Sequence, residues 1–169
     1  MERRKFLSMG LAVAAAVVVP VTDLNAVNFR ESKPKAWDAE KSTDAIKAMF
    51  GDGALTPTDK IKMVAPKLAE NGGSIPITLK SDLDIETIAL FQDANPRAAT
   101  VVFSVPADQK VDYSFRIKMR QTAMVTIVAK TRDGKLLTLG KEIDVSIGGC
   151  GGWFNHPILQ QEIIKQNKI

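Results

Sequence analysis

The chain contains one cysteine, Cys150, and one histidine, His156, and both lie near its carboxyl end. The cysteine stands in the stretch SIGGCGGWFNHP and is flanked on each side by two glycines: Gly148, Gly149, Gly151 and Gly152. Glycine has no side-chain bulk and populates nearly all backbone conformations, so the four glycines and the cysteine form a thin arm of five residues that reaches roughly 17 Å when extended. The pattern predicts a thiol that an arm presents to other molecules.

The glycines favour a carried thiol over a catalytic one. A catalytic nucleophile must be held in place by its neighbours, which a glycine arm cannot do. A thiol with the ordinary pKa near 8.5 is only about 3% thiolate at pH 7, so a partner that receives the arm would have to activate it. His156 follows six residues later and is a candidate for assisting the thiol. We favour the alternative, in which this histidine beside a proline is a surface residue.

The rest of the sequence predicts no metal site, no cofactor and no enzyme. One histidine and one cysteine cannot form a zinc or copper site of Cys and His ligands within one chain. No glycine-rich loop leads from a predicted strand into a helix, as a nucleotide site requires. The net charge of +4 comes from dispersed residues and not from a basic stripe with interleaved aromatic side chains, so nucleic-acid binding is not expected.

Residues 1–26 have the features of an export signal. Arg3 and Arg4 begin an Arg-Arg-x-Phe-Leu sequence, and an Ala/Val run follows and ends at Pro20. That run is too short to span a bilayer core of about 30 Å, so we expect a signal peptide and no stable membrane anchor. The paired arginines indicate the twin-arginine type; an ordinary secretory signal is the alternative. Cleavage after Ala26 would leave a periplasmic protein whose single cysteine stays free, binds a partner or is modified.

The central part of the chain predicts an antiparallel β-sandwich. Residues 27–38 are polar and irregular, which indicates a linker, and residues 38–53 contain a short amphipathic helix that we expect to cover one edge of the fold. From Lys60 onward, about eight short runs, among them IETIALFQ and the alternating residues 114–120, are separated by turn signals such as Asn71-Gly72-Gly73 and Asn95-Pro96. Asp133-Gly134 predicts a hairpin. The last two runs are KLLTL and KEIDVSI. Such spacing is typical of a sandwich.

These features divide the chain into five parts. We expect a signal peptide (1–26), a linker with a short helix (27–59), a β-sandwich carrier domain (60–147), a flexible arm (148–152) and a C-terminal extension (153–169).

The sequence resembles the SoxY family, the substrate-carrier subunits of periplasmic thiosulfate oxidation. Beside the twin-arginine-like start, four stretches carry the resemblance: APKLAENGGSIPITL (65–79), ALFQDANPRAATVVFSVP (89–106), SFRIKMRQTAMVTIVAKTRDGKL (114–136) and KEIDVSIGGCGG (141–152). The resemblance implies an immunoglobulin-like sandwich that pairs with a second small β protein, SoxZ. It also implies that a SoxZ without its own signal could be exported folded onto this chain.

The resemblance further implies that Cys150 is the point of covalent substrate attachment and that the four glycines form a swinging arm. A haem-containing partner would link thiosulfate to the thiol oxidatively, which gives a cysteine S-thiosulfonate. A hydrolase would release the terminal sulfonate as sulfate and leave a sulfane sulfur. In some systems a sulfane dehydrogenase oxidises that sulfur further.

The sequence departs from the family pattern after the arm. Family members typically end at or near GGCGG, whereas here WFNHPILQQEIIKQNKI (153–169) follows, in which Asn155 and Pro157 predict the start of a short helix. An internal arm must enter a channel as a doubled-back loop, which is thicker than a free end. The extension is a lid or dock for a partner, a segment that lies over an exposed patch of the sandwich, or a piece removed on maturation.

Two other classes of function stay open. A redox or binding protein would use Cys150 to form a mixed disulfide and would carry no sulfur. A structural adhesion or assembly module would not need this thiol, and Cys150→Ser would then be silent in any functional assay.

Overall fold

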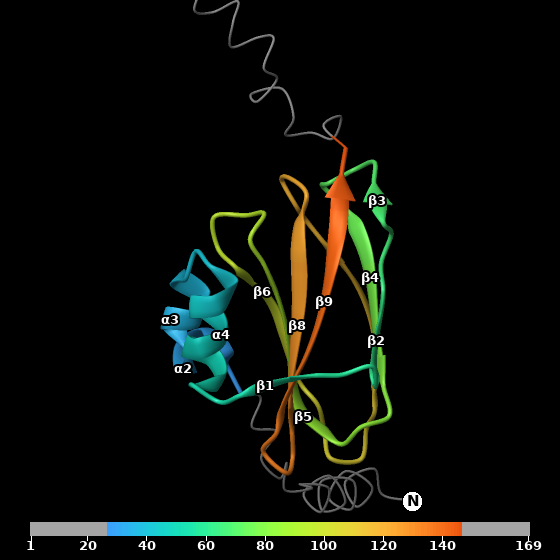
Figure 1. The fold of residues 1–169 in the computed structure, drawn as a ribbon. Coiled ribbons are helices and arrows are strands. Elements are labelled where there is room, and N and C mark those ends of the chain that lie inside the picture. The colour runs from blue at the N-terminus through green and yellow to red at the C-terminus, as the bar shows by residue number, and fades with distance from the viewer. Residues whose placement is uncertain (1–26, 147–169) are drawn as a thin grey trace, which may run out of the picture.

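Two β-sheets face each other and enclose the core in the computed structural model, which describes residues 27–146 (Figure 1). The larger sheet has the strand order β1-β9-β8-β5-β6, with β3 also paired to β9, and the smaller sheet has the order β2-β4-β7. Strands β1 and β3 run parallel to β9, and the other paired strands are antiparallel. The nine strands of this part of the chain are β1 (Leu55–Pro57), β2 (Ile61–Val64), β3 (Leu68–Ala69), β4 (Ile75–Ser81), β5 (Ile85–Gln92), β6 (Ala99–Ser104), β7 (Val111–Ile117), β8 (Ala123–Thr131) and β9 (Leu136–Val145).

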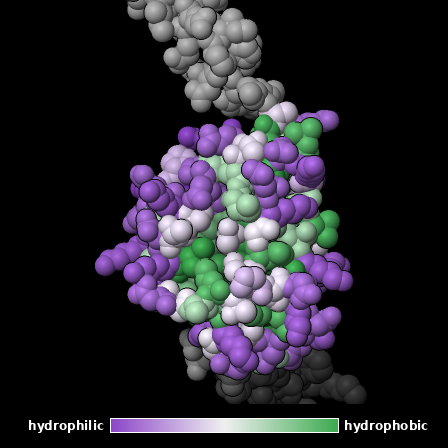
Figure 2. Space-filling model, viewed as in Figure 1, coloured by the Kyte–Doolittle hydropathy of each residue, from purple (hydrophilic) through white to green (hydrophobic). Residues whose placement is uncertain are grey.

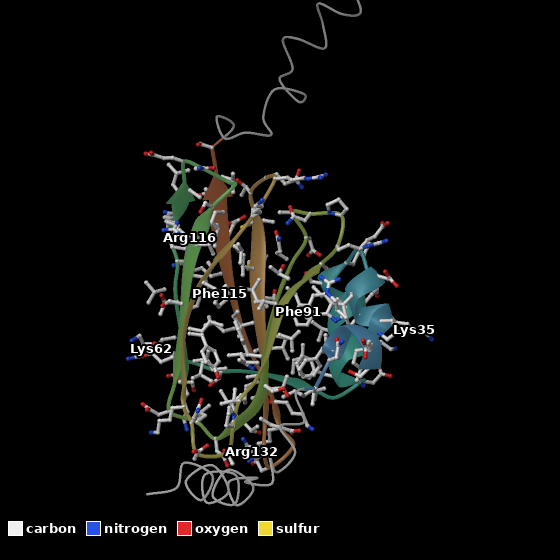
Figure 3. The ribbon with its side chains drawn as sticks, turned by 180° about the vertical axis from the view of Figure 1, so that it is seen from behind. Lys35, Lys62, Phe91, Phe115, Arg116 and Arg132 are labelled. Carbon is white, nitrogen blue, oxygen red and sulfur yellow. The ribbon has the colours of Figure 1, made fainter. Side chains whose placement is uncertain are left out.

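The core forms because alternate side chains of each strand point inward. In β4 the inward residues Ile75, Ile77 and Leu79 are at most 1% exposed, while the residues between them face solvent. Strand β5 is buried on both faces: one face packs against the smaller sheet, and Ala89 and Phe91 on the other face pack toward the helices. Figure 3 shows Phe91 on the helix side and Phe115 between the two sheets. The sandwich predicted from the alternation is therefore confirmed.

Three short helices cover the outer face of β5, β6 and β8, and not only an edge as predicted (Figure 1). They are α2 (Phe29–Ser32), α3 (Pro34–Asp38) and α4 (Ser42–Phe50). Helix α4 confirms the predicted helix, but the prediction of a linker at residues 27–38 is wrong. Trp37 donates its indole N–H to the Phe29 carbonyl at 3.0 Å and lies under the Arg30 guanidinium at 4.5 Å. Ala36 is fully buried, so side-chain packing orders a segment that looked irregular.

Three predicted strand positions also need correction. Residues 136–145 of the two runs KLLTL and KEIDVSI form the single strand β9, because Gly140 pairs with Thr126 and does not interrupt the strand. Strand β7 begins three residues before the predicted run of 114–120 and ends at Ile117, although the alternation continues to the buried Met119. The sandwich begins at β1 and not at residue 60.

The predicted Asp133-Gly134 hairpin joins β8 to β9. Gly134 adopts a φ of 86°, a left-handed conformation that glycine tolerates without strain, and its N–H donates to the Thr131 carbonyl at 2.9 Å. The hairpin lies at one end of the sandwich, and the carboxyl end of β9 lies at the other (Figure 1). This arrangement fixes the end of the molecule from which the chain continues toward the glycines.

The surface is mostly hydrophilic, with apolar side chains gathered in the middle of the face that Figure 2 shows. Large apolar side chains that stay substantially exposed are Val27, Leu55, Val64, Leu68 and Met124. No helix within residues 27–146 is long and apolar enough to cross a membrane.

Candidate functional site

The residues predicted to act directly lie outside the described residues. They are the thiol Cys150, the arm glycines Gly148, Gly149, Gly151 and Gly152, the candidate assistant His156 and the signal residues Arg3 and Arg4. Their roles stay predictions, as do those of the signal peptide (1–26) and the extension (153–169). What the structure describes is the position from which the arm departs, Ser146 at the end of β9.

The end of β9 is held by strand β3 on one side. β3 pairs with β9 so that Leu68 lies opposite Asp144 and Ala69 lies opposite Val145. The Asp144 N–H donates to the Lys67 carbonyl at 2.9 Å, and the Ser146 N–H donates to the Ala69 carbonyl at 3.0 Å. The last described residue is therefore still bonded to the sandwich.

Two side chains complete this attachment. The Thr122 hydroxyl oxygen accepts the Val145 N–H at 2.9 Å, and the Ser146 hydroxyl donates to the Glu70 carbonyl at 3.1 Å. Further back on β9, the Lys141 ammonium donates to the Ala65 carbonyl at 2.6 Å. We call residues 144–146, together with residues 67–72 and Thr122, the arm root. Its bonds give the arm a fixed origin.

Gly72 packs against the arm root so closely that a side chain would not fit. A Cβ atom at this position would lie 2.4 Å from the Met119 carbonyl oxygen and 2.8 Å from Val145 Cγ1. The same two segments are joined by a hydrogen bond from the Met119 N–H to the Gly72 carbonyl at 2.8 Å. The Asn71-Gly72-Gly73 turn, predicted only as a turn, thus supports the end of β9.

The turn at Asn95-Pro96 lies at this end of the sandwich as well. The Asn95 side-chain amide donates to the Lys118 carbonyl at 2.8 Å, and the buried Gln92 amide donates to the same oxygen at 3.0 Å. Lys118 directly precedes Met119, which bonds to Gly72. Hydrogen bonds therefore connect the arm root with two turns that the sequence predicted separately.

The charges around the arm root are of both signs and exposed. Arg116, Lys118 and Arg120 alternate at the end of β7 and beyond it, and Glu70 and Glu142 are also exposed.

The largest change in proton affinity lies at the opposite end of the molecule. A hydrogen bond from Lys135 at 2.5 Å, together with the Thr131 hydroxyl, lowers the pKa of Asp133 to about 2. The same contact raises the pKa of Lys135. These groups belong to the β8–β9 hairpin, so they stabilise a turn and have no part in the arm root.

The described residues offer no second site for chemistry. No cluster of three or more His, Cys, Asp or Glu side chains that could hold a metal occurs within residues 27–146. A surface hollow of about 590 Å³ lies between the start of α4 and the β5–β6 turn. Its carboxylate Asp93 accepts the Ser42 N–H at 2.7 Å, so this group caps a helix.

With this geometry in place, comparison with known families identifies the chain. The family described as sulfur oxidation protein SoxY matches residues 46–150, which is more than half of the sequence, and the match ends on Cys150. The chain belongs to the SoxY family. The SoxY match begins within α4, includes the whole sandwich and the arm root, and stops before the C-terminal extension.

A solved structure agrees with this assignment. The chain is 31% identical to the sulfur carrier protein SoxY from Chlorobium limicola f thiosulfatophilum, with a TM-score of 0.56, over 62% of this chain and 94% of that one. A superoxide reductase (neelaredoxin) from Ignicoccus hospitalis is 17% identical with a TM-score of 0.47, over 53% of this chain and 82% of that one. At that score the second likeness carries no inference. No curated protein matches the chain.

Membership in the SoxY family confirms the predicted resemblance and the all-β, immunoglobulin-like fold. It assigns the chain to the carriers of sulfur in sulfur oxidation and not to the enzymes. It also implies a SoxZ-type partner subunit.

Proposed function

We propose that the protein carries the sulfur intermediates of thiosulfate oxidation as covalent adducts of Cys150. The observation that carries this proposal is the family match, which runs through the sandwich and ends on this cysteine. The arm root supports it, because the bonds that fix Ser146 to the sandwich leave only three residues between that anchor and the thiol. The short connection ties the thiol to a rigid body that a partner can bind.

The proposed chemistry begins with an oxidative coupling. The Cys150 thiolate and thiosulfate join through a new S–S bond, and the two electrons released pass to a haem-containing partner enzyme. Water then attacks the terminal sulfonate on a hydrolase, which breaks the outer S–S bond. That step releases sulfate and two protons and leaves a sulfane sulfur on the cysteine. A sulfane dehydrogenase is the class of enzyme that would oxidise this sulfur further.

In this scheme the carrier positions the thiol and catalyses no step. The glycines on both sides of Cys150 leave its approach free of side chains. An arm of five residues reaches roughly 17 Å, which suits an active site at the bottom of a channel. Activation of the thiol then falls to the enzyme that receives the arm.

We place the protein in the periplasm, as one subunit of a heterodimer with a SoxZ-like protein. The support for export is the Arg3-Arg4 signal followed by its short apolar run. A twin-arginine signal fits because that pathway exports folded proteins, so a partner bound to this chain would be exported with it.

The test is the intact mass of the protein, isolated from cells grown with and without thiosulfate and measured before and after reduction. We expect an added mass of sulfane sulfur or thiosulfonate that depends on thiosulfate, is removed by reduction and maps to Cys150. The same spectrum shows where the signal is cleaved and whether residues 153–169 remain.

The matched control is Cys150→Ser, which should show no added mass under any growth condition. A bare thiol in cells that oxidise thiosulfate would contradict sulfur carriage. A protein–protein disulfide without any sulfur adduct would contradict it too, and would support the redox protein that uses a mixed disulfide.

A further inference from the structure

The outer face of the smaller sheet carries an excess of positive charge. Alternate residues of β2, β4 and β7 point away from the core, and four outward side chains on these strands and just beyond β7 are basic: Lys62, Lys80, Arg116 and Lys118. Asp112 is the single acid at the outward positions of the three strands. We call this surface the basic face. Figure 3 shows Lys62 and Arg116 on this side of the molecule and Lys35 on the opposite side, with the helices.

Two cations of the basic face lie directly opposite one another. β2 and β4 pair so that Lys62 lies opposite Lys80, and β4 and β7 pair so that Lys80 lies opposite Asp112. Like charges directly opposite on antiparallel strands are destabilising. The Asp112 carboxylate accepts a hydrogen bond from Lys80 at 3.0 Å, but no salt bridge within residues 27–146 reaches Lys62. The sheet therefore retains an unfavourable pair of charges that an acidic partner would neutralise.

The middle of the basic face is uncharged and made of short side chains. The Thr78 and Ser114 hydroxyls lie 2.9 Å apart and share a hydrogen bond, and Val64 is paired opposite Thr78. Tyr113 and Phe115 point inward, where their rings pack against the larger sheet. The outward positions of the three strands thus hold no aromatic ring on which a base could stack. Such a surface fits an acidic protein better than a nucleic acid.

The basic face adjoins the arm root. The Arg116 guanidinium donates to the Ser74 hydroxyl at 3.3 Å, directly after the turn that supports the end of β9. Lys118 precedes Met119, whose N–H donates to the Gly72 carbonyl of the arm root at 2.8 Å. An enzyme that receives the arm must approach its origin, so that enzyme comes within reach of these cations.

We propose that the basic face binds an acidic surface of the enzyme that attaches thiosulfate to Cys150. This inference rests on the proposed function. Exposed charges mainly raise the rate of association and orient the partner, which suits a carrier that must bind one enzyme, leave it and bind the next. A permanent subunit would instead cover a more apolar surface, and Val64 is the one substantially exposed large apolar side chain at the outward positions of the three strands.

The test is the rate at which the full chain, purified with its SoxZ-type subunit, acquires the thiosulfate-derived mass from the purified haem-containing enzyme. We expect kcat/KM to fall as the ionic strength rises from about 0.01 to 1 M, because the Debye length shrinks from about 30 to 3 Å. At low salt, Lys62→Glu combined with Arg116→Glu should lower kcat/KM about tenfold, the low end of the gain from electrostatic steering. The natural chain and this variant should load equally at high salt.

The matched control is Lys33→Glu combined with Lys35→Glu. It makes the same change in net charge among the exposed residues of α3 and its start, on the helix side of the molecule. We expect it to load nearly as fast as the natural chain. Equal losses in the two double variants would overturn the inference, as would loading that does not depend on salt.

Thermal unfolding separates docking from folding. Lys62→Glu places a carboxylate opposite Lys80, so this single variant should keep the Tm of the natural chain or raise it, and it should still slow loading at low salt. A lower Tm that accompanies the slower loading would overturn the inference, because the loss would then come from a damaged sheet.

Two further measurements decide between occupants of the basic face. Release of the SoxZ-type subunit by Arg116→Glu in gel filtration would overturn the inference, because that subunit would then cover the face. Binding to vesicles of phosphatidylcholine and phosphatidylglycerol that Arg116→Glu abolishes, and Lys35→Glu does not, would assign the face to a lipid surface. A natural chain that acquires no mass would contradict sulfur carriage itself, whereas mass that appears at equal rates in every variant would contradict only the docking surface.

Discussion

At the scale of single residues, Gly72 is the position where a side chain would do most harm to the arm root. Its Cβ would meet the backbone oxygen of Met119, which cannot move without displacing the β7–β8 turn. The other close atom, Val145 Cγ1, belongs to the last residue of β9. The space that a methyl group would need is therefore taken by the element that must point the arm.

We accordingly expect Gly72→Ala to lower the free energy of unfolding by about 1–3 kcal/mol, the usual cost of overpacking. Urea denaturation followed by circular dichroism measures it. Gly140→Ala is the matched control: its nearest neighbour is the Met124 sulfur at 3.2 Å, on a side chain that is 48% exposed and can move. Equal losses in the two variants would contradict the assigned role of Gly72.

At the scale of elements, the carboxyl end of β9 is held from two sides by bonds that can be broken one at a time. On one side, β3 and the residue before it supply backbone acceptors for the amides of Asp144 and Ser146. On the other side, the β7–β8 turn supplies the Thr122 hydroxyl for the amide of Val145. An amide exchanges with solvent when its own local bond opens.

Thr122→Val should therefore speed exchange of the Val145 amide about fivefold, the effect of losing a hydrogen bond worth about 1 kcal/mol. The amides of Asp144 and Ser146 should be nearly unaffected, because their acceptors lie on the other side. Hydrogen exchange followed by NMR resolves the three. Thr122→Ser keeps the hydroxyl and should behave like the natural chain; faster exchange of all three amides in Thr122→Val would mean that the arm root opens as one unit.

Long elements with regular alternation could be predicted from the sequence. The run IETIALFQ became β5 with the same bounds, and the helix around Ile46 and the hairpin at Gly134 were also found. Strands β1 and β3 were missed, because two or three residues are too few to show a period and both depend on pairing with β9. Helices α2 and α3 were missed because Trp37 and Ala36 pack against partners that local pattern does not reveal.

The sequence pointed to one part of the candidate site and missed another. The role of the Cys150 thiol stays a prediction, which rests on its being the only cysteine and on the glycines around it. The arm root could not be predicted, since it joins Gly72, Thr122 and Ser146 from three separate parts of the chain. The turn signal at Asn71-Gly72 was visible, but only the fold shows that this turn lies against the end of β9.

At the scale of the whole molecule, the C-terminal extension makes the arm an internal segment of the chain. We expect this to slow the attachment of sulfur to Cys150. An internal arm must fold back on itself to bring Cys150 into a channel, whereas a chain that ends at Gly152 can enter as a single strand. We expect a chain that stops after Gly152 to acquire the thiosulfate-derived mass severalfold faster than the full chain, with the same partner enzyme and as followed by intact mass. The matched control is the truncated chain with Cys150→Ser, which should stay unmodified. Slower loading after truncation would instead assign residues 153–169 to the docking of that enzyme, because a chain without its docking segment would bind the enzyme less tightly.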